Sequence, residues 1–130
     1  MQFKENQTIY LQIAERISDE ILLGHYAFGA RIPSVREYAV LVEVNANTVM
    51  RSYEFLQTQG IIFNKRGIGF FVSPDAKHKI TEYRRNEFLK TELPRFFMQL
   101  YTLHIPMDEI DSMYREFIEN LTSNPSNQAS

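Results

Sequence analysis

The sequence predicts a mainly α-helical protein that carries one small β-hairpin. Apolar residues recur at helical spacing over residues 9–59 and again over residues 77–121. Between them, residues 61–72 are rich in β-branched and aromatic residues and are interrupted by glycine, which is typical of a hairpin. From these patterns we expect an N-terminal domain of residues 1–73, a helical module of residues 74–121 and a disordered polar tail of residues 122–130.

The first predicted helix covers residues 9–23. Isoleucine occurs in it at i, i+4 spacing, which predicts a buried face. Gly24 follows at the place where a left-handed glycine commonly ends a helix. We interpret this helix as a packing element without a site of its own. The isoleucines are Ile9, Ile13, Ile17 and Ile21.

A helix-turn-helix is predicted next. Ser34 and Glu37 have the spacing of a capping box, and Pro33 prevents an earlier start, so a helix begins at Val35. Residues 43–45 interrupt the apolar pattern, and Asn45 is a favourable N-cap for a second helix over residues 46–59. Two helices joined by so short a turn are typical of DNA-binding proteins.

The second of these helices has one apolar and one polar face. Val49 lies at the centre of the apolar face, with Tyr53 and Leu56 beside it. The outward N-terminal end can donate hydrogen bonds to phosphates and base edges, which favours double-stranded DNA as the partner. This polar end consists of Asn45, Asn47, Thr48 and Arg51.

Arginines near this end have an alternative interpretation. Arg36, two residues after the Ser34 cap, is placed to meet the DNA backbone, but it could instead pair with a surface carboxylate. Arg51 could be occupied by Glu54 or Glu37.

The predicted hairpin follows Gly60. Gly67 can adopt the positive φ of a tight turn, and Lys65 and Arg66 are expected at its tip. A basic hairpin directly after a recognition helix is a wing, whose expected target is a phosphate or the minor groove. The alternative is an ordinary solvated turn.

A longer series of positions from Thr8 to Val72 follows one pattern: tyrosine, Gln-Ile, two glycines, Leu-Pro-Ser, arginine, alanine, Thr-Val, leucine, glycine and Gly-x-Gly-x-Phe-Val. Here these positions hold Tyr10, Gln12, Ile13, Gly24, Gly29, Ile32, Pro33, Ser34, Arg36, Ala39, Thr48, Val49, Leu56, Gly60, Gly67, Gly69, Phe71 and Val72. In them the chain resembles the winged-helix domain of GntR-family bacterial transcription regulators. The run NANTVMRSY is most similar to the small YtrA-like branch of that family.

The resemblance implies DNA contact through Arg36, Asn45, Asn47, Thr48, Arg66 and Gly67, and a short helical dimerisation module after the winged helix. Two departures bear on the site. Ala46 and Met50 stand where many members carry arginine, so base reading relies more on asparagine and threonine. Glu43 stands at the usual turn glycine. We combine the residues implied by the resemblance with those predicted from the helix and hairpin patterns. The predicted DNA-binding residues are then Ser34, Arg36, Asn45, Asn47, Thr48, Arg51, Lys65, Arg66 and Gly67.

Two helices are expected after residue 74. The first, over residues 77–103, contains Pro94, which predicts one long helix kinked near residues 90–94 or, as the alternative, two helices. The last follows Pro106. Their apolar stripes are too large to cover each other, so we expect a homodimer with two recognition helices about 34 Å apart. The expected interface is Leu89, Leu93, Phe96, Phe97, Leu100 and Tyr101; alternatively these residues pack on the last helix and the N-terminal domain.

Composition excludes some classes of protein. The net charge of −2 is not that of a basic nucleic-acid binder, but residues 31–73 carry net +2 and residues 108–121 carry net −4, so the charge is polarised. The chain has no cysteine, apolar signal region or membrane-spanning run, and a cytoplasmic protein is expected. His25, His78 and His104 lack ligand spacing, so no metal or other cofactor is expected.

The sequence therefore predicts a dimeric, sequence-specific transcription regulator, a repressor rather than an enzyme, that binds an inverted-repeat operator. Two alternatives remain open. One is a winged-helix module for protein contact or assembly that does not bind DNA. The other is a regulator that senses a small-molecule effector in an aromatic cleft between the C-terminal helices, although the sequence supplies no convergent polar anchors there.

Overall fold

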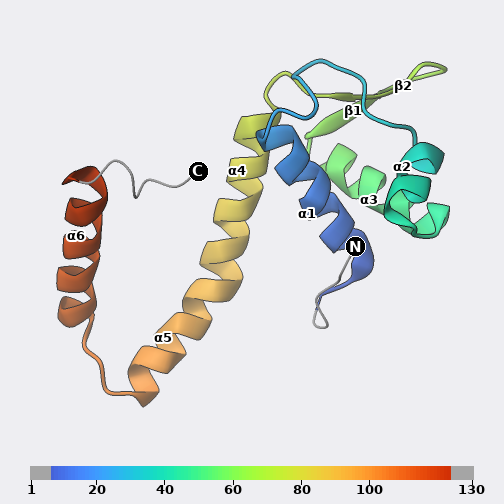
Figure 1. Ribbon diagram of the computed structural model, residues 1–130. Helices are drawn as coiled ribbons and strands as arrows, with labels where there is room; N and C mark the ends of the chain where they lie inside the picture. The colour runs from blue at the N-terminus through green and yellow to red at the C-terminus, as the bar shows by residue number, and fades with distance from the viewer. Residues whose placement is uncertain (1–6, 124–130) are drawn as a thin grey trace. The chain divides into compact units, whose positions relative to one another are not determined.

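The computed structural model describes residues 7–123 (Figure 1). The chain divides into two compact units, residues 1–85 and 86–130. The first unit thus includes, besides the expected domain of residues 1–73, most of the next helix. Of the predicted tail, residues 124–130 lie outside the described residues. Thr122 and Ser123 instead form the end of the last helix, because its apolar stripe continues to Leu121 and the backbone stays helical beyond it.

The first unit confirms the predicted fold class, mainly α with one hairpin. Its helices begin and end close to the predicted residues, with caps that the sequence explains. Gly24 has a φ of +84° just after the first helix, as a left-handed terminator requires. The elements are α1 (Ile9–Leu22), α2 (Val35–Val42), α3 (Ala46–Thr58), β1 (Ile62–Lys65), β2 (Gly69–Val72) and the greater part of α4 (Ala76–Glu87).

The two strands pair antiparallel, with Phe63 opposite Phe71 and Lys65 opposite Gly69. The segment before α2, which the sequence pattern predicts as a loop, also pairs with β2. Arg31 forms a bridge with Phe71, and the Ile32 amide donates to the Phe70 carbonyl at 2.9 Å. The hairpin is therefore hydrogen-bonded to the segment that leads into α2. This pairing connects the wing to the helix-turn-helix.

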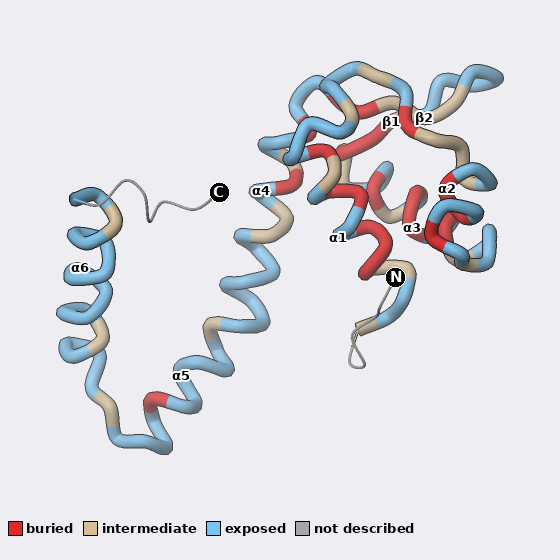
Figure 2. Tube along the Cα trace, in the orientation of Figure 1, coloured by how far each residue is buried: buried red, intermediate tan, exposed pale blue. Residues whose placement is uncertain are grey.

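The core of this unit is formed by the predicted apolar faces. Val49, Tyr53 and Leu56 of α3 are fully buried, as are most of the α1 isoleucines, whereas Ile9 is exposed because it lies in the first turn. Figure 2 shows the buried positions concentrated in this unit. Ala76 and Ile80 join the same core, so α4 is anchored to the winged helix. An ion pair of 2.7 Å between Arg84 of α4 and Asp19 of α1 also anchors α4.

A partly buried polar cluster connects α1 with α2. The Glu20 carboxylate accepts hydrogen bonds from the Tyr38 hydroxyl and, at 3.3 Å, from the Tyr26 hydroxyl. Burial raises the pKa of Tyr38, with the hydrogen bond to Glu20 adding to the effect, so this tyrosine stays a neutral donor. The cluster fixes α2 against α1 and was not apparent from the sequence, because it joins positions far apart in the chain.

In the second unit, helix continues through a π-helical segment, η1 (Phe88–Glu92), into α5 (Leu93–Thr102), and α6 (Met107–Ser123) follows. The disruption expected at residues 90–94 takes the form of this π segment. Pro94 cannot donate to the Lys90 carbonyl, and a widened turn directly before it accommodates the missing bond. Of the described apolar residues here, Leu100 alone is buried, while α5 and α6 are otherwise exposed or half-buried.

Candidate DNA-binding surface

The start of α2 is fixed by its capping box. The Glu37 amide donates to Ser34 Oγ at 3.1 Å, and the Ser34 amide donates to the Glu37 carboxylate at 2.9 Å. Hydrogen bonds to the Glu37 carboxylate from the Ser34 backbone, and secondarily from the Ser34 side chain, lower the pKa of Glu37, so it is ionised at neutral pH. Ser34 is therefore a cap first, and because phosphate oxygens are acceptors, its hydroxyl could contact DNA phosphate only by donating its O–H. Arg36 is exposed in the first turn, and within residues 7–123 no carboxylate pairs with it.

The turn between α2 and α3 depends on Glu43, which has a φ of 56° and a left-handed conformation. At this position the sequence has glutamate where the turn of a helix-turn-helix usually has glycine. A residue with a Cβ is strained there. The conformation nevertheless lets the Val44 amide donate to the Ala39 carbonyl at 3.1 Å, which closes the end of α2 and directs the chain into α3.

The polar end of α3 holds the predicted base-reading residues, of which Asn45 is partly occupied. Its side-chain oxygen accepts from the Asn47 amide at 2.8 Å and caps the helix. Paired recognition of adenine by asparagine needs both the oxygen and the amino group. Asn47 is exposed and Thr48 half-buried, and neither side chain has a recorded partner among the described residues. Asn47 thus presents an exposed side-chain amide at the N-terminal end of α3.

Arg51 lies one turn beyond Asn47 and is engaged within the protein. Its guanidinium carbon is 4.2 Å from the centroid of the Tyr10 ring, which belongs to α1. Neither Glu37 nor Glu54 pairs with it, so the alternative interpretation of an ion pair does not apply in this structure. This contact was not predictable from the sequence pattern, because it joins two helices that are far apart in the chain.

The wing differs from the prediction in one respect. Arg66 and Gly67 lie in the turn, and Gly67 has the expected positive φ of 78°, but Lys65 is the last residue of β1. Its ammonium nitrogen is 4.5 Å from the Phe71 ring centroid, and the Phe71 ring stacks on Phe63. Lys65 is therefore held by an aromatic platform rather than projecting from the tip. Arg66 remains exposed at the turn.

Arg31 is a basic residue of this surface that the sequence reasoning did not select. It is exposed, bridges to Phe71 of β2, and passes so close to Gly69 that a Cβ there would lie 2.8 Å from its Nε. A signal was present: Arg31 immediately precedes Ile32 and the capped helix. Its proximity to the wing could not be inferred without the pairing of this segment with β2.

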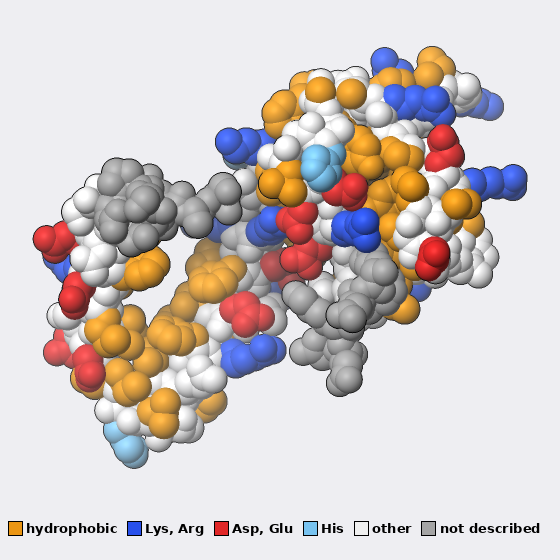
Figure 3. Space-filling view, in the orientation of Figure 1, with side chains coloured by type: hydrophobic (Ala, Val, Ile, Leu, Met, Phe, Trp, Pro, Cys, Tyr) orange, Lys and Arg blue, Asp and Glu red, His pale blue; other side chains and the backbone are white. Residues whose placement is uncertain are grey.

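Positive charge gathers on this part of the first unit. Figure 3 shows Lys and Arg side chains around the hairpin end and beside α2. The basic residues from Arg31 to Ser73 exceed the acidic ones by two. Arginine donors, an amide side chain at a helix N-terminus and a basic hairpin are together suited to phosphate and base contact.

The comparison with known proteins agrees with this geometry. The model of the bacterial regulatory proteins of the gntR family matches residues 9–72. Over 91% of its length the chain is also 31% identical to the HTH-type transcriptional regulator YhcF of Bacillus subtilis, covering 96% of that protein. The chain belongs to the GntR family.

Two further GntR-family similarities extend beyond the winged helix. The HTH-type transcriptional repressor YtrA of Bacillus subtilis is 28% identical, with 87% of this chain and 86% of YtrA covered. A crystal structure of a GntR-family regulator from Bacteroides thetaiotaomicron is 62% identical, with 87% of this chain and 98% of that chain covered and a TM-score of 0.75. The chain is therefore a GntR-family transcription regulator with a DNA-binding helix-turn-helix, similar to the YtrA branch, and not an enzyme.

Two other properties of this GntR-family chain concern its described part. Among residues 7–123, no group of three His, Cys, Asp or Glu side chains is placed to hold a metal ion. In the same range, no helix combines the length and the apolar character that crossing a bilayer requires.

Proposed function

We propose that the protein is a homodimeric repressor that binds an inverted-repeat operator in the cytoplasm. The observation that carries the DNA contacts is the exposed pair of Arg36 and Asn47 at the starts of α2 and α3, without partners among the described residues. Asn47 reads a base edge in the major groove, while Arg36 meets the backbone. Arg66, Gly67 and the platform-bound Lys65 contact the adjacent minor groove or its phosphates. The similarity to a repressor, YtrA, supports the direction of regulation.

Fluorescence anisotropy with labelled duplex from the upstream region of the gene tests this placement. The Arg36→Ala/Asn47→Ala variant is expected to bind at least about tenfold more weakly than the wild type. Arg85→Ala/Gln57→Ala removes the same charge and an amide from exposed positions outside the surface, and is expected to bind normally. Equal binding by the two double variants would refute the placement. Absence of salt-sensitive, sequence-selective binding by the wild type would leave the protein-contact alternative.

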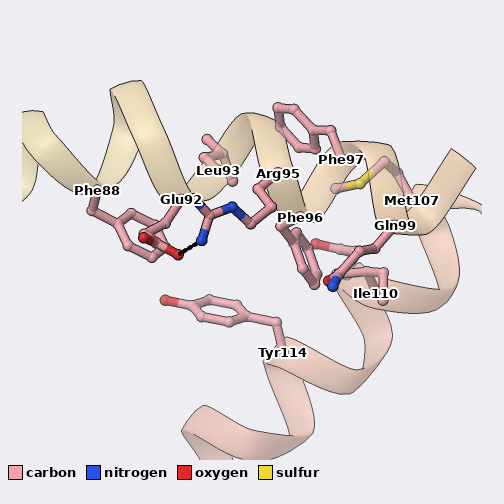
Figure 4. A pocket seen from close by; sticks show the side chains of 11 residues that line it. Phe88, Glu92, Leu93, Arg95, Phe96, Phe97, Gln99, Met107, Ile110 and Tyr114 are labelled. Carbon is pink, nitrogen blue, oxygen red and sulfur yellow. Dashed lines mark ion pairs between the residues drawn. The ribbon is translucent and has the colours of Figure 1, made fainter. Parts of the chain in front are cut away.

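The support for a homodimer is the apolar surface of the second unit. Aromatic and aliphatic side chains of α5 and α6 remain exposed, and Figure 3 shows hydrophobic side chains gathered along both helices. Between them lies an open groove of about 740 Å³. Exposed apolar surface of this extent marks an interaction site. Figure 4 shows the groove, which is lined by Phe88, Glu92, Leu93, Arg95, Phe96, Phe97, Gln99, Met107, Ile110, Asp111 and Tyr114.

A second copy is the occupant that fits this groove. The same unit offers both an apolar recess and exposed apolar side chains, such as Phe117 and Met113 of α6, which an isologous partner can exchange. Of the interface predicted from the sequence, Phe96, Phe97, Leu89 and Tyr101 are exposed, Leu93 is half-buried and Leu100 is buried within the chain. Leu100 therefore packs inside its own chain, beneath the proposed interface, and does not contact the partner.

Sedimentation velocity at micromolar concentration tests the dimer. Phe97→Glu introduces a charge at the groove, whereas Met98→Glu introduces the same charge at a neighbouring residue that does not line it. Phe97 is 46% exposed and Met98 62%, so neither change buries a charge in the single chain. We expect Phe97→Glu to sediment as a monomer and Met98→Glu as a dimer. A monomeric wild type would contradict the proposal.

An effector site in the groove is the second candidate function, and the groove has the volume of a small-molecule site. Its polar lining supports a ligand less well, because Glu92 and Arg95 pair with each other at 3.7 Å. If a small molecule were the occupant, the Phe97→Glu variant would have the same sedimentation coefficient as the wild type.

A further inference from the structure

The N-terminal turn of α1 supplies an aromatic face to a residue of the recognition helix. The Arg51 guanidinium lies over the Tyr10 ring, 4.2 Å from its centroid. Arg51 is exposed and Tyr10 half-buried. A stacked guanidinium keeps its N–H donors free at the edge of the plane, because the ring occupies only its face. Stacking therefore orients Arg51 without consuming its hydrogen-bonding groups.

The backbone of Tyr10 is itself held in place. Ser52, the residue after Arg51, is fully buried and donates from Oγ to the Tyr10 carbonyl at 2.7 Å. The same proton is shared with the Thr48 carbonyl of its own helix, which lies 3.2 Å from Oγ. The backbone of Tyr10 is thus tied directly to α3, next to the arginine that its ring supports. The ring that lies against Arg51 therefore extends from a backbone position that is tied to α3 before any ligand binds.

The place of Arg51 along α3 indicates what it meets. In helix-turn-helix proteins the N-terminal residues of the recognition helix contact bases. Here those residues are Asn45, Asn47 and Thr48. Arg51 lies one turn farther along α3, and its guanidinium lies against Tyr10 of α1. A cation at that place is suited to a phosphate at the groove edge rather than to a base.

We propose that Tyr10 is a positioning residue that holds Arg51 for contact with a DNA phosphate. The inference rests on the proposed DNA binding. Arg51 then adds affinity for any duplex and no preference between sequences, and Tyr10 acts through Arg51 alone.

A double-mutant cycle measured by fluorescence anisotropy tests this role. Arg51→Ala is expected to weaken binding to operator and unrelated duplex by the same factor, about three- to tenfold, and to reduce the slope of log affinity against log salt by about one. Tyr10→Leu is expected to weaken both in the same way. Tyr10→Phe keeps the stacking ring and is expected to bind as the wild type does. In the Arg51→Ala background, Tyr10→Leu is expected to cause no further loss.

Two results would overturn the role of Tyr10. One is an equal loss in Tyr10→Phe and Tyr10→Leu, which would make the hydroxyl itself the contact. The other is a loss from Tyr10→Leu that is the same with and without Arg51.

A measurement on the free protein separates this inference from the proposed function. The side-chain proton resonances of Arg51 should be shifted upfield by the ring current in the wild type and in Tyr10→Phe, but not in Tyr10→Leu. If these shifts are present and the wild type binds no duplex, DNA binding at this face fails, and the proposal for Arg51 fails with it. If DNA binds and the shifts are absent, only the positioning role is refuted.

Discussion

Tyr53 of α3 donates a hydrogen bond from its hydroxyl to the carbonyl oxygen of Pro33 across 2.6 Å. Pro33 directly precedes the cap of α2, so this bond ties the recognition helix to the start of its partner helix. The Tyr53 ring also meets the Phe70 ring of the wing edge-on, with 5.1 Å between centroids. One buried side chain therefore sets the spacing of α2, α3 and the wing.

Removing that hydroxyl should destabilise the winged helix. Tyr53→Phe leaves the Pro33 carbonyl without this donor, and we expect the free energy of unfolding to fall by about 1–2 kcal/mol. Tyr101→Phe removes a hydroxyl from a side chain that is 79% exposed and should change the value by less than about 0.5 kcal/mol. Chemical denaturation measures both. Coincident unfolding curves for the two variants would show that the bond does not contribute.

The capping box should give α2 a dependence on acid. The pKa of Glu37 in the folded protein is below its ordinary value of 4.5, because the Ser34 backbone and side chain hydrogen-bond to it. A lowered folded pKa means that the stabilisation is complete above pH 4.5 and is lost as the pH falls through the folded pKa. The difference in unfolding free energy between the wild type and Glu37→Gln should therefore shrink in acid. A difference independent of pH would contradict this account.

The strained turn residue offers a stabilising change. Glu43→Gly relieves the left-handed strain and should raise the free energy of unfolding by about 1 kcal/mol. It also removes a negative charge beside the recognition helix, which should strengthen DNA binding. Glu43→Gln is the matched control, because it removes the charge and keeps the strain; it should change affinity but not stability. A Glu43→Gly variant no more stable than Glu43→Gln would indicate that the turn is unstrained.

Arg31 is expected to belong to the DNA surface through its contact with the wing. Arg31→Ala should lower affinity about three- to tenfold and reduce the salt slope by about one, whereas Arg85→Ala should do neither. Gly69→Ala should have a similar effect, because its Cβ would meet Arg31 Nε at 2.8 Å and displace it. Anisotropy on the double variant completes the test. Additive losses would mean that Gly69 acts on binding independently of Arg31.

The fold was predictable where its determinants are local. The Ser34 and Glu37 cap, the Asn45 cap and the 3.6-residue spacing of Val49, Tyr53 and Leu56 all act within a few residues, and each prediction is confirmed. The hairpin was predictable for the same reason. The form of the helix disruption before Pro94 was less predictable, because either a kink or a π segment can accommodate the hydrogen bond that proline cannot donate.

The parts that were missed depend on contacts between distant positions. The pairing of Arg31 with Phe71, the Tyr10 ring beneath Arg51 and the Glu20 carboxylate between Tyr38 and Tyr26 each join separate elements. No periodicity encodes such pairs. The sequence therefore identified the polar end of α3 and its Asn45 cap as the candidate site, but could not tell that Lys65 rests on Phe71 or that Arg31 lies beside the wing.

Selection of duplexes from a random pool, followed by sequencing, tests the central claim most directly. A dimer that presents two copies of α3 and the wing should enrich an inverted repeat whose half-sites are centred about 10 base pairs apart or a multiple of that spacing. The Asn47→Ala variant should lose preference at positions within each half-site and keep the spacing. Enrichment of no motif, or of a single half-site without a repeat, would contradict a dimeric regulator that reads DNA through this surface.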